Sequence, residues 1–198
     1  NWERSHPYRY IAHNGEINTL RGAENWMTSH KIEIYNEENS DSAKLENCME
    51  YLYRNGRDMP HALLMMIPEA WGKEAGLSPE LTSFYEYTSS FMAPWDGPAA
   101  LVFTDGDTVG ARLDRNGLRP SRYSITKDNF IVCSSESGVV DFEPSRVVEK
   151  GVLGPGNMML VDTVNGKILR TEEVKKHYAA QFPYEKWLDN TLLHLDDL

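Results

Sequence analysis

The sequence has little cysteine, no long apolar run and no excess of basic residues. Its 198 residues include two cysteines, Cys48 and Cys133, which are too few for a disulfide framework and indicate a reducing compartment. No apolar run approaches the about 20 residues that a membrane-spanning helix needs. The formal net charge of −10 argues against nucleic acid as a partner, because such binding depends on neutralising phosphates.

The first residues and the histidines exclude two further classes. Residues 1–4 have no apolar stretch like that of a signal peptide, so we expect a cytoplasmic protein without a membrane partner. The six histidines show no metal-ligand spacing with one another or with a cysteine, so we expect no metal site. An ordinary globular composition remains, 40% hydrophobic and 11% aromatic, in a length that suits one domain.

The pattern of apolar and turn residues changes along the chain. Residues 8–12 predict a short strand, and 59–71 are apolar but of uncertain type. Helices are expected from Asn18 or Thr19, from Ser40 to Gly56, and from Ser78, the last burying Phe91 among others. Hairpin signals predict strands at 98–104, 108–113, 121–126, 130–134, 157–164 and 167–170, with helix again from Thr171.

The most informative stretch is His13-Asn14-Gly15-Glu16-Ile17-Asn18-Thr19. An Asn-Gly pair can direct an amide side chain and an unhindered backbone N–H at one point. Two donors that converge on one oxygen form an oxyanion hole, which stabilises negative charge during acyl transfer. The same dipeptide is a common two-residue hairpin turn, so the pair alone favours a turn over an active site.

The residues around this pair favour the active site. Residues 5–22 resemble the glutamine-amidotransferase domain of the glutamate synthase family, a class II amidotransferase with the N-terminal-nucleophile hydrolase fold. The resemblance covers almost the whole chain and implies that Asn14 and Gly15 are the oxyanion donors. Ala23 stands where the family pattern has Asn, at a position that looks structural.

Asp41, within Ser40-Asp41-Ser42, has two interpretations. Residues of these types commonly cap a helix. The resemblance implies a second role, because class II amidotransferases carry a Ser-Asp pair before a helix, and its Asp accepts the α-ammonium group of glutamine. That contact is charge-assisted. We favour substrate binding by Asp41, with a neighbouring serine as the cap, and expect its carboxylate to face one cavity together with the donors of Asn14 and Gly15.

Residues 114–120, Asp-Arg-Asn-Gly-Leu-Arg-Pro, form a third landmark. Glycine and proline here predict a sharp turn. The run also resembles the D-x-x-G-x-R-P element of class II amidotransferases, whose role looks mainly architectural. Arg115, Arg119 and Arg122 are candidates for ion pairs that span the core. Cys48 and Cys133 lie in apolar segments, and we expect both to be structural, since a buried thiol is unreactive.

The resemblance also says what the sequence lacks. The class uses an N-terminal Cys, whose thiol attacks glutamine and whose own α-amine acts as the base, but Asn1 stands first here. The arginine that binds the glutamine α-carboxylate lies, in the family, upstream of the residue matched by Trp2. We therefore expect an N-terminally truncated fragment that retains the oxyanion donors and has no glutaminase activity.

The resemblance also bears on the fold, the ligands and the parent protein. It implies an α+β fold, an αββα sandwich of two antiparallel sheets between helical layers, with residues 1–171 as a partial amidotransferase domain and 172–198 as a helical connector. It implies glutamine and glutamate as ligands, and the remaining parent domains and a small reductase subunit as partners. FMN, an iron–sulfur cluster and NADPH or ferredoxin would belong to the parent, with no cofactor in these residues. The alternative is a non-catalytic binding or regulatory module with a relic amidotransferase fold.

Overall fold

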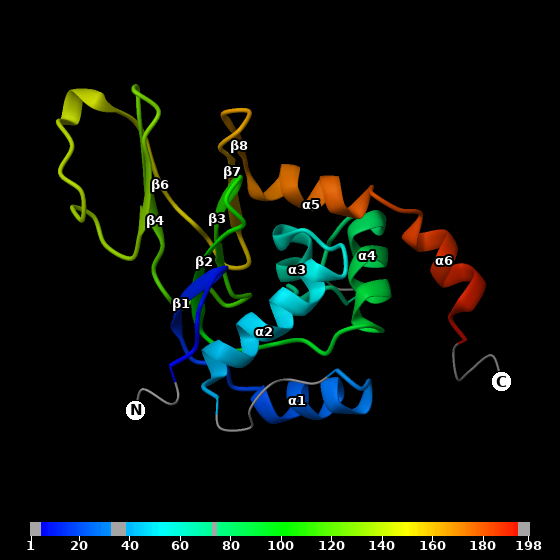
Figure 1. Ribbon diagram of the computed structural model, residues 1–198. Helices are drawn as coiled ribbons and strands as arrows, with labels where there is room; N and C mark the ends of the chain where they lie inside the picture. Colours follow the sequence, from blue (N-terminus) through cyan, green and yellow to red (C-terminus); the bar gives the residue numbers. More distant parts are fainter. Residues whose placement is uncertain (1–4, 33–38, 73–74, 194–198) are drawn as a thin grey trace.

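Two antiparallel sheets and a group of helices make up the computed structural model, which describes residues 5–32, 39–72 and 75–193. Figure 1 shows the helices gathered on one side of the larger sheet and the smaller sheet on its other side (Figure 1). The α-helices are α1 (Leu20–Ser29), α2 (Asp41–Arg54), α3 (Met59–Met66), α4 (Pro79–Ser89), α5 (Thr171–Ala179) and α6 (Tyr184–Thr191). A 3-10 turn, η2, covers Pro144–Arg146.

The larger sheet has five strands in the order β1-β2-β3-β7-β8, and the smaller has three in the order β5-β4-β6. Their bounds are β1 (Ile11–Gly15), β2 (Ala99–Thr104), β3 (Thr108–Leu113), β4 (Arg122–Thr126), β5 (Ile131–Ser134), β6 (Val147–Val152), β7 (Met158–Asp162) and β8 (Lys167–Leu169). The three predicted hairpins are confirmed. Strand β6 was not predicted from the sequence.

The first strand differs from the prediction. The sequence placed it at 8–12, before the Asn-Gly pair, whereas β1 runs through that pair to Gly15. The reason is a partner distant in sequence, because β1 pairs along its whole length with β2, from Ile11 opposite Phe103 to Gly15 opposite Ala99. The hairpin interpretation of Asn14-Gly15 is therefore wrong.

The helices begin close to where capping residues predicted. Ser40 caps α2 by accepting the Ala43 N–H at 3.2 Å, and Ser78 caps α4 by accepting the Leu81 N–H at 3.3 Å. Thr19 precedes α1 as expected, but its hydroxyl accepts the Asp96 N–H at 2.9 Å instead of capping the helix. Phe91 lies beyond the end of α4 and is 49% exposed, so its predicted burial is wrong.

The main core lies between the helices and one face of the five-stranded sheet. It joins side chains of that sheet, such as Leu101 and Leu160, to side chains from every α-helix. The opposite face packs on the three-stranded sheet through a much smaller cluster of Ala111, Leu113, Leu153 and Met159. The α+β class with two antiparallel sheets is thus confirmed. Among the described residues the α-helices pack on the five-stranded sheet only, and no α-helix covers the outer face of the three-stranded sheet.

The last helices complete the helical side. Val174 and Tyr178 of α5 and Tyr184 of α6 are buried in the main core. The division of the chain at residues 171 and 172 stays a prediction. Within the described ranges, no helix is both long and apolar enough to span a membrane.

Candidate active site at the end of strand β1

Gly15 occupies a position that only glycine fits. Its φ is +149°, and a Cβ placed there would lie 1.8 Å from the carbonyl oxygen of Pro98. A side chain at this position would therefore push β1 off β2. The backbone of β1 approaches the start of β2 closely because residue 15 has no side chain.

The N–H of Gly15 points to the open edge of the sheet. Strand β1 is an edge strand, and successive backbone N–H groups of a strand point to opposite sides. The N–H of Glu16 donates to the Pro98 carbonyl at 3.1 Å, on the side of β2. The N–H of Gly15, one residue earlier, therefore points away from β2, where a ligand can reach it.

Asn14 lies on the face that looks toward the three-stranded sheet. It is paired with Ala100, which packs against the cluster between the two sheets. Here Asn14 lines a cavity of about 300 Å³ together with side chains that include Arg119, Ser121 and Cys133. Arg119 donates from Nη2 to Asn14 Oδ1 and from Nε, at 3.3 Å, to the backbone carbonyl of Asn14.

The Asp41 carboxylate lies beside the loop that follows β1. Its Oδ2 accepts the Ile17 N–H at 3.1 Å, and its Oδ1 accepts the Ser42 N–H at 2.7 Å. Burial alone would raise the pKa of Asp41, but these backbone N–H groups and nearby His13 outweigh it and hold the pKa below its usual value. Asp41 is therefore ionised at neutral pH, as a partner for an ammonium group must be.

His13 connects β1 to the start of α2. Its Nε2 lies 2.6 Å from the hydroxyl of Ser42. Burial lowers the pKa of His13, although the charge of Asp41 opposes the shift, so the ring is neutral at pH 7. The sequence alone predicts no role for His13. The signal that could have indicated a role is its position, because His13 directly precedes the Asn-Gly pair and lies on the opposite face of the strand from Asn14.

The structure brings the three predicted groups to one end of β1, but not into one enclosed cavity. The Gly15 N–H faces the open edge of the sheet. The Ile17 N–H, two residues further on, faces the same edge and donates to the Asp41 carboxylate. Asn14 lines the cavity on the adjoining face, and neither Gly15 nor Asp41 is among the residues that line that cavity. A ligand that reaches all three has to lie across the edge of the sheet.

The turn at residues 114–120 is built around a buried carboxylate. Asp114 is fully buried and accepts the N–H groups of Ala99, Asn116 and Gly117 at 3.0, 2.9 and 3.2 Å. It thus joins the turn to the start of β2. The expected core-spanning ion pairs are wrong, because Arg115 pairs with Asp96 at the surface and, within the described ranges, the buried arginine is Arg112.

The two cysteines have different surroundings. Cys48 is fully buried on α2, and burial raises its pKa to about 12, so its thiol is unreactive as predicted. Cys133 is half-buried, lies 3.2 Å from the hydroxyl of Ser121 and lines the cavity beside Asn14.

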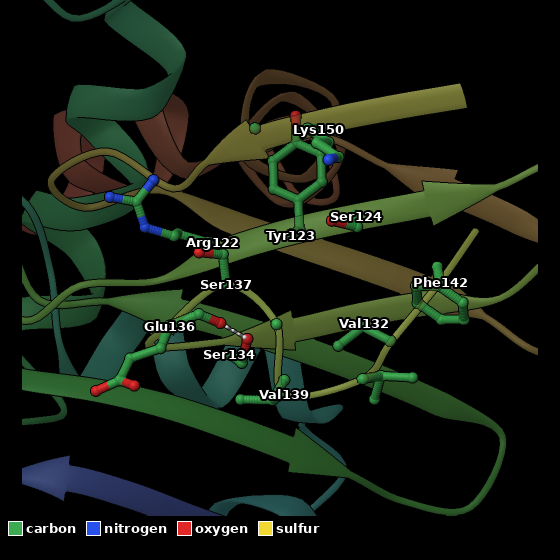
Figure 2. Close-up of a pocket in the computed structure, with 13 residues that line it drawn as sticks. Arg122, Tyr123, Ser124, Val132, Ser134, Glu136, Ser137, Val139, Phe142 and Lys150 are labelled. Atoms are coloured by element: carbon green, nitrogen blue, oxygen red, sulfur yellow. Dashed lines mark hydrogen bonds between the residues drawn. The ribbon is translucent and has the colours of Figure 1, made fainter. Parts of the chain in front are cut away.

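A second pocket, of about 110 Å³, lies on the outer face of the three-stranded sheet. Figure 2 shows Arg122 at one end of it and Phe142 at the other, with Ser134 and Val132 of β5 between them (Figure 2). None of the predicted site residues lines this pocket. Ser134, at the end of β5, lines both this pocket and the cavity that Asn14 lines.

Comparison with known proteins identifies the class. The model of the class II glutamine amidotransferase family matches residues 1–187. The chain therefore belongs to this family. The match includes β1, the start of α2 and the turn at residues 114–120.

The chain is also similar to individual proteins. It is 47% identical to the glutamate synthase [NADPH] large chain of Bacillus subtilis, over 98% of this chain and 14% of that protein. It is 42% identical to the glutamate synthase [NADH] of Schizosaccharomyces pombe, over 100% of this chain and 10% of that protein. The chain thus spans a small part of the curated relatives it matches. A solved glutamine phosphoribosylpyrophosphate amidotransferase from B. subtilis aligns with a TM-score of 0.47 at 18% identity, over 81% of this chain and 28% of that one.

Proposed function

We propose that this chain is the glutamine-hydrolysing domain of a glutamate synthase. In this function the domain releases ammonia and glutamate from glutamine, and the ammonia is used elsewhere in the parent protein for the reductive amination of 2-oxoglutarate. The observation that carries the proposal is the identity of 47% over 98% of the chain to a glutamate synthase large chain. The site geometry supports it independently.

The chemistry needs stabilisation of one developing negative charge. Attack of a thiol on the side-chain amide of glutamine turns the carbonyl oxygen into an oxyanion, ammonia leaves, and water then hydrolyses the thioester. In the proposal the Nδ2 of Asn14 and the N–H of Gly15 donate to that oxygen. Removing one such donor typically lowers the rate by about 100- to 1,000-fold.

Asp41 would bind the other end of the substrate. Its carboxylate is held by two backbone N–H groups and is ionised, so it can accept the α-ammonium group of glutamine. The attacking thiol is assigned to the N-terminal cysteine that the class uses. Cys48 is excluded by its burial, and Cys133 has no free α-amine to act as its base.

The residues here do not suit the redox groups that the resemblance implies for the parent. An iron–sulfur cluster needs several cysteine thiolates, and this sequence has two cysteines, one of them fully buried. Within the described ranges no group of three or more His, Cys, Asp or Glu side chains is placed to hold a metal. We assign FMN, the iron–sulfur cluster and the site of NADPH or ferredoxin oxidation to other parts of the parent or to a small reductase subunit.

The test is ammonia release from glutamine by the complete protein that contains this chain. The expected result is stoichiometric glutamate and ammonia, and coupling to 2-oxoglutarate when an electron donor is supplied. A polypeptide of residues 1–198 alone is expected to release none, because neither of its cysteines can serve as an N-terminal nucleophile. A complete protein that binds glutamine without hydrolysing it would instead support the non-catalytic alternative.

A further inference from the structure

We infer that Arg119 is a positioning residue that fixes which end of the Asn14 carboxamide faces the substrate. This inference rests on the proposed function and deepens it. Arg119 lies in the turn after β3 and is 105 residues from Asn14 in sequence. The family resemblance implies a mainly architectural role for this turn.

The guanidinium group of Arg119 makes two hydrogen bonds to Asn14. Arg119 donates from Nη2 to Oδ1 of Asn14 and from Nε to the backbone carbonyl of the same residue. A guanidinium group has five N–H donors and no acceptor. Only the oxygen of the carboxamide can therefore face Arg119, and the NH2 group must point away from it.

The orientation matters because the two ends of a carboxamide have almost the same shape. A rotation of 180° exchanges a donor for an acceptor with little steric cost. If Oδ1 faced the substrate, its partial negative charge would repel the developing oxyanion instead of stabilising it. Arg119 excludes that rotamer before the substrate binds, which is the kind of preorganisation that oxyanion stabilisation needs. No bond is made or broken at Arg119.

The surroundings hold the guanidinium group in place. Arg119 is next to Pro120, and both line the cavity with Asn14. Asp114 fixes the turn that carries Arg119 to the start of β2. Gly117 in the same turn has a φ of +59° and lies too close to Pro155 to carry a Cβ. Arg119 therefore reaches Asn14 from a rigid turn, not from a mobile loop.

A competing role for Arg119 makes the opposite kinetic prediction. A cation in the cavity could bind the α-carboxylate of glutamine directly. Loss of that contact would raise KM for glutamine. A positioning role lowers kcat for ammonia release and leaves KM nearly unchanged, because the oxyanion forms only after binding.

The experiment uses the complete enzyme and compares Arg119→Met, Arg119→Lys and the control Arg122→Met. Arg122 lies three residues further on, lines the outer pocket of Figure 2 and does not line the Asn14 cavity. Arg119→Met is expected to lower kcat by about 10- to 100-fold, less than the loss of a whole oxyanion donor. Arg119→Lys, which retains a donor, should recover part of that loss. Arg122→Met should leave kcat unchanged.

Two Asn14 variants separate positioning from general structural support. In an Asn14→Ala background, Arg119→Met should cause little further loss, since residues that act through one group are not additive. Asn14→Asp keeps an acceptor for Arg119 but has no NH2, so it should fold normally and lose activity as fully as Asn14→Ala. Thermal unfolding of each variant is compared with that of the wild type.

The outcomes distinguish a failure of the Arg119 role from a failure of the proposed function on which it rests. A wild-type enzyme that releases no ammonia from glutamine overturns the proposed function and this role together. An active wild type with an unchanged kcat in Arg119→Met, a KM increase alone, or full additivity with Asn14→Ala overturns only the role of Arg119. If Arg119→Met fails to fold, Asn14→Asp decides, since retained activity in that variant contradicts the need for the NH2 group.

Discussion

The two faces of the five-stranded sheet are packed very differently. On one face, side chains from all the α-helices form a continuous core in which residues such as Leu63 and Phe84 are fully buried. On the other face, four buried residues are the main contact with the three-stranded sheet. The candidate site lies where the two regions meet, since Asn14 comes from β1 and Arg119 from the turn that leads into β4.

This difference indicates a division of roles. Elements with few buried apolar contacts open at a lower free energy than elements in a dense core. The helical side therefore holds β1 and α2 in place, and with them Gly15 and Asp41. The three-stranded side is the more easily opened part, and the Asn14 cavity lies next to it.

The largest expected effect compares one leucine on each side. Leu63→Ala, in the helical core, is expected to destabilise the domain by about 3 to 5 kcal/mol, because a fully buried side chain leaves a cavity that dense neighbours cannot fill. Leu153→Ala, in the smaller cluster, should cost about 2 kcal/mol, near the lower limit for such changes. Urea unfolding of the domain measures both. An equal or larger loss for Leu153→Ala would contradict the contrast.

A second prediction concerns pH and His61, which is buried in the helical core. Burial, helped by nearby Arg57, lowers the pKa of His61 from 6.5 to about 4. Because the folded pKa is depressed, its contribution to stability is complete above pH 6.5 and is lost as the pH falls toward 4. The loss is about 3 kcal/mol at most, at 1.36 kcal/mol per pKa unit.

The variant His61→Phe isolates that contribution. Its free energy of unfolding should fall less than that of the wild type between pH 7 and pH 4.5, and urea titrations at several pH values give the difference. Parallel curves for the two proteins would show that His61 does not titrate with the expected depressed pKa.

The smallest expected effect is at the start of α2. Ser40→Ala removes the acceptor for the Ala43 N–H and should destabilise the domain by about 1 kcal/mol. Ser89→Ala is a matched control, since its exposed hydroxyl donates only to the Glu86 carbonyl near the end of α4. Thermal unfolding compares the two, and equal shifts would argue against a specific capping role for Ser40.

Local sequence signals predicted most of the elements, because caps and turns act over a few residues. Ser40 and Ser78 cap the helices that they predict, and the predicted strands 157–164 and 167–170 pair as the hairpin β7–β8. The sequence does not determine helix α3, because the helix is buried on every side and has no polar face to give a period. Strand β6 is not predicted because Gly151 weakens its strand signal. The glycine is needed there because a Cβ would lie 2.3 Å from the ring of Tyr123.

Contacts between distant residues were beyond local signals. The pairing of β1 with β2 extended the first strand through Asn14 and Gly15, and nothing near residue 14 indicated it. The contact between Arg119 and Asn14 likewise depends on the fold bringing a turn and a strand together. The family resemblance predicted which residues belong to the site, but not that Asp41 and Asn14 approach it from different sides of the edge of the sheet.

The most direct test of the central claim is a crystal structure of the complete protein with glutamate, the product of the proposed reaction. The account predicts one oxygen of the side-chain carboxylate within about 3.1 Å of both Asn14 Nδ2 and the Gly15 N–H. It also predicts the α-ammonium group on the carboxylate of Asp41. Glutamate bound away from the end of β1, or bound there with Asn14 Oδ1 turned toward it, would contradict the account.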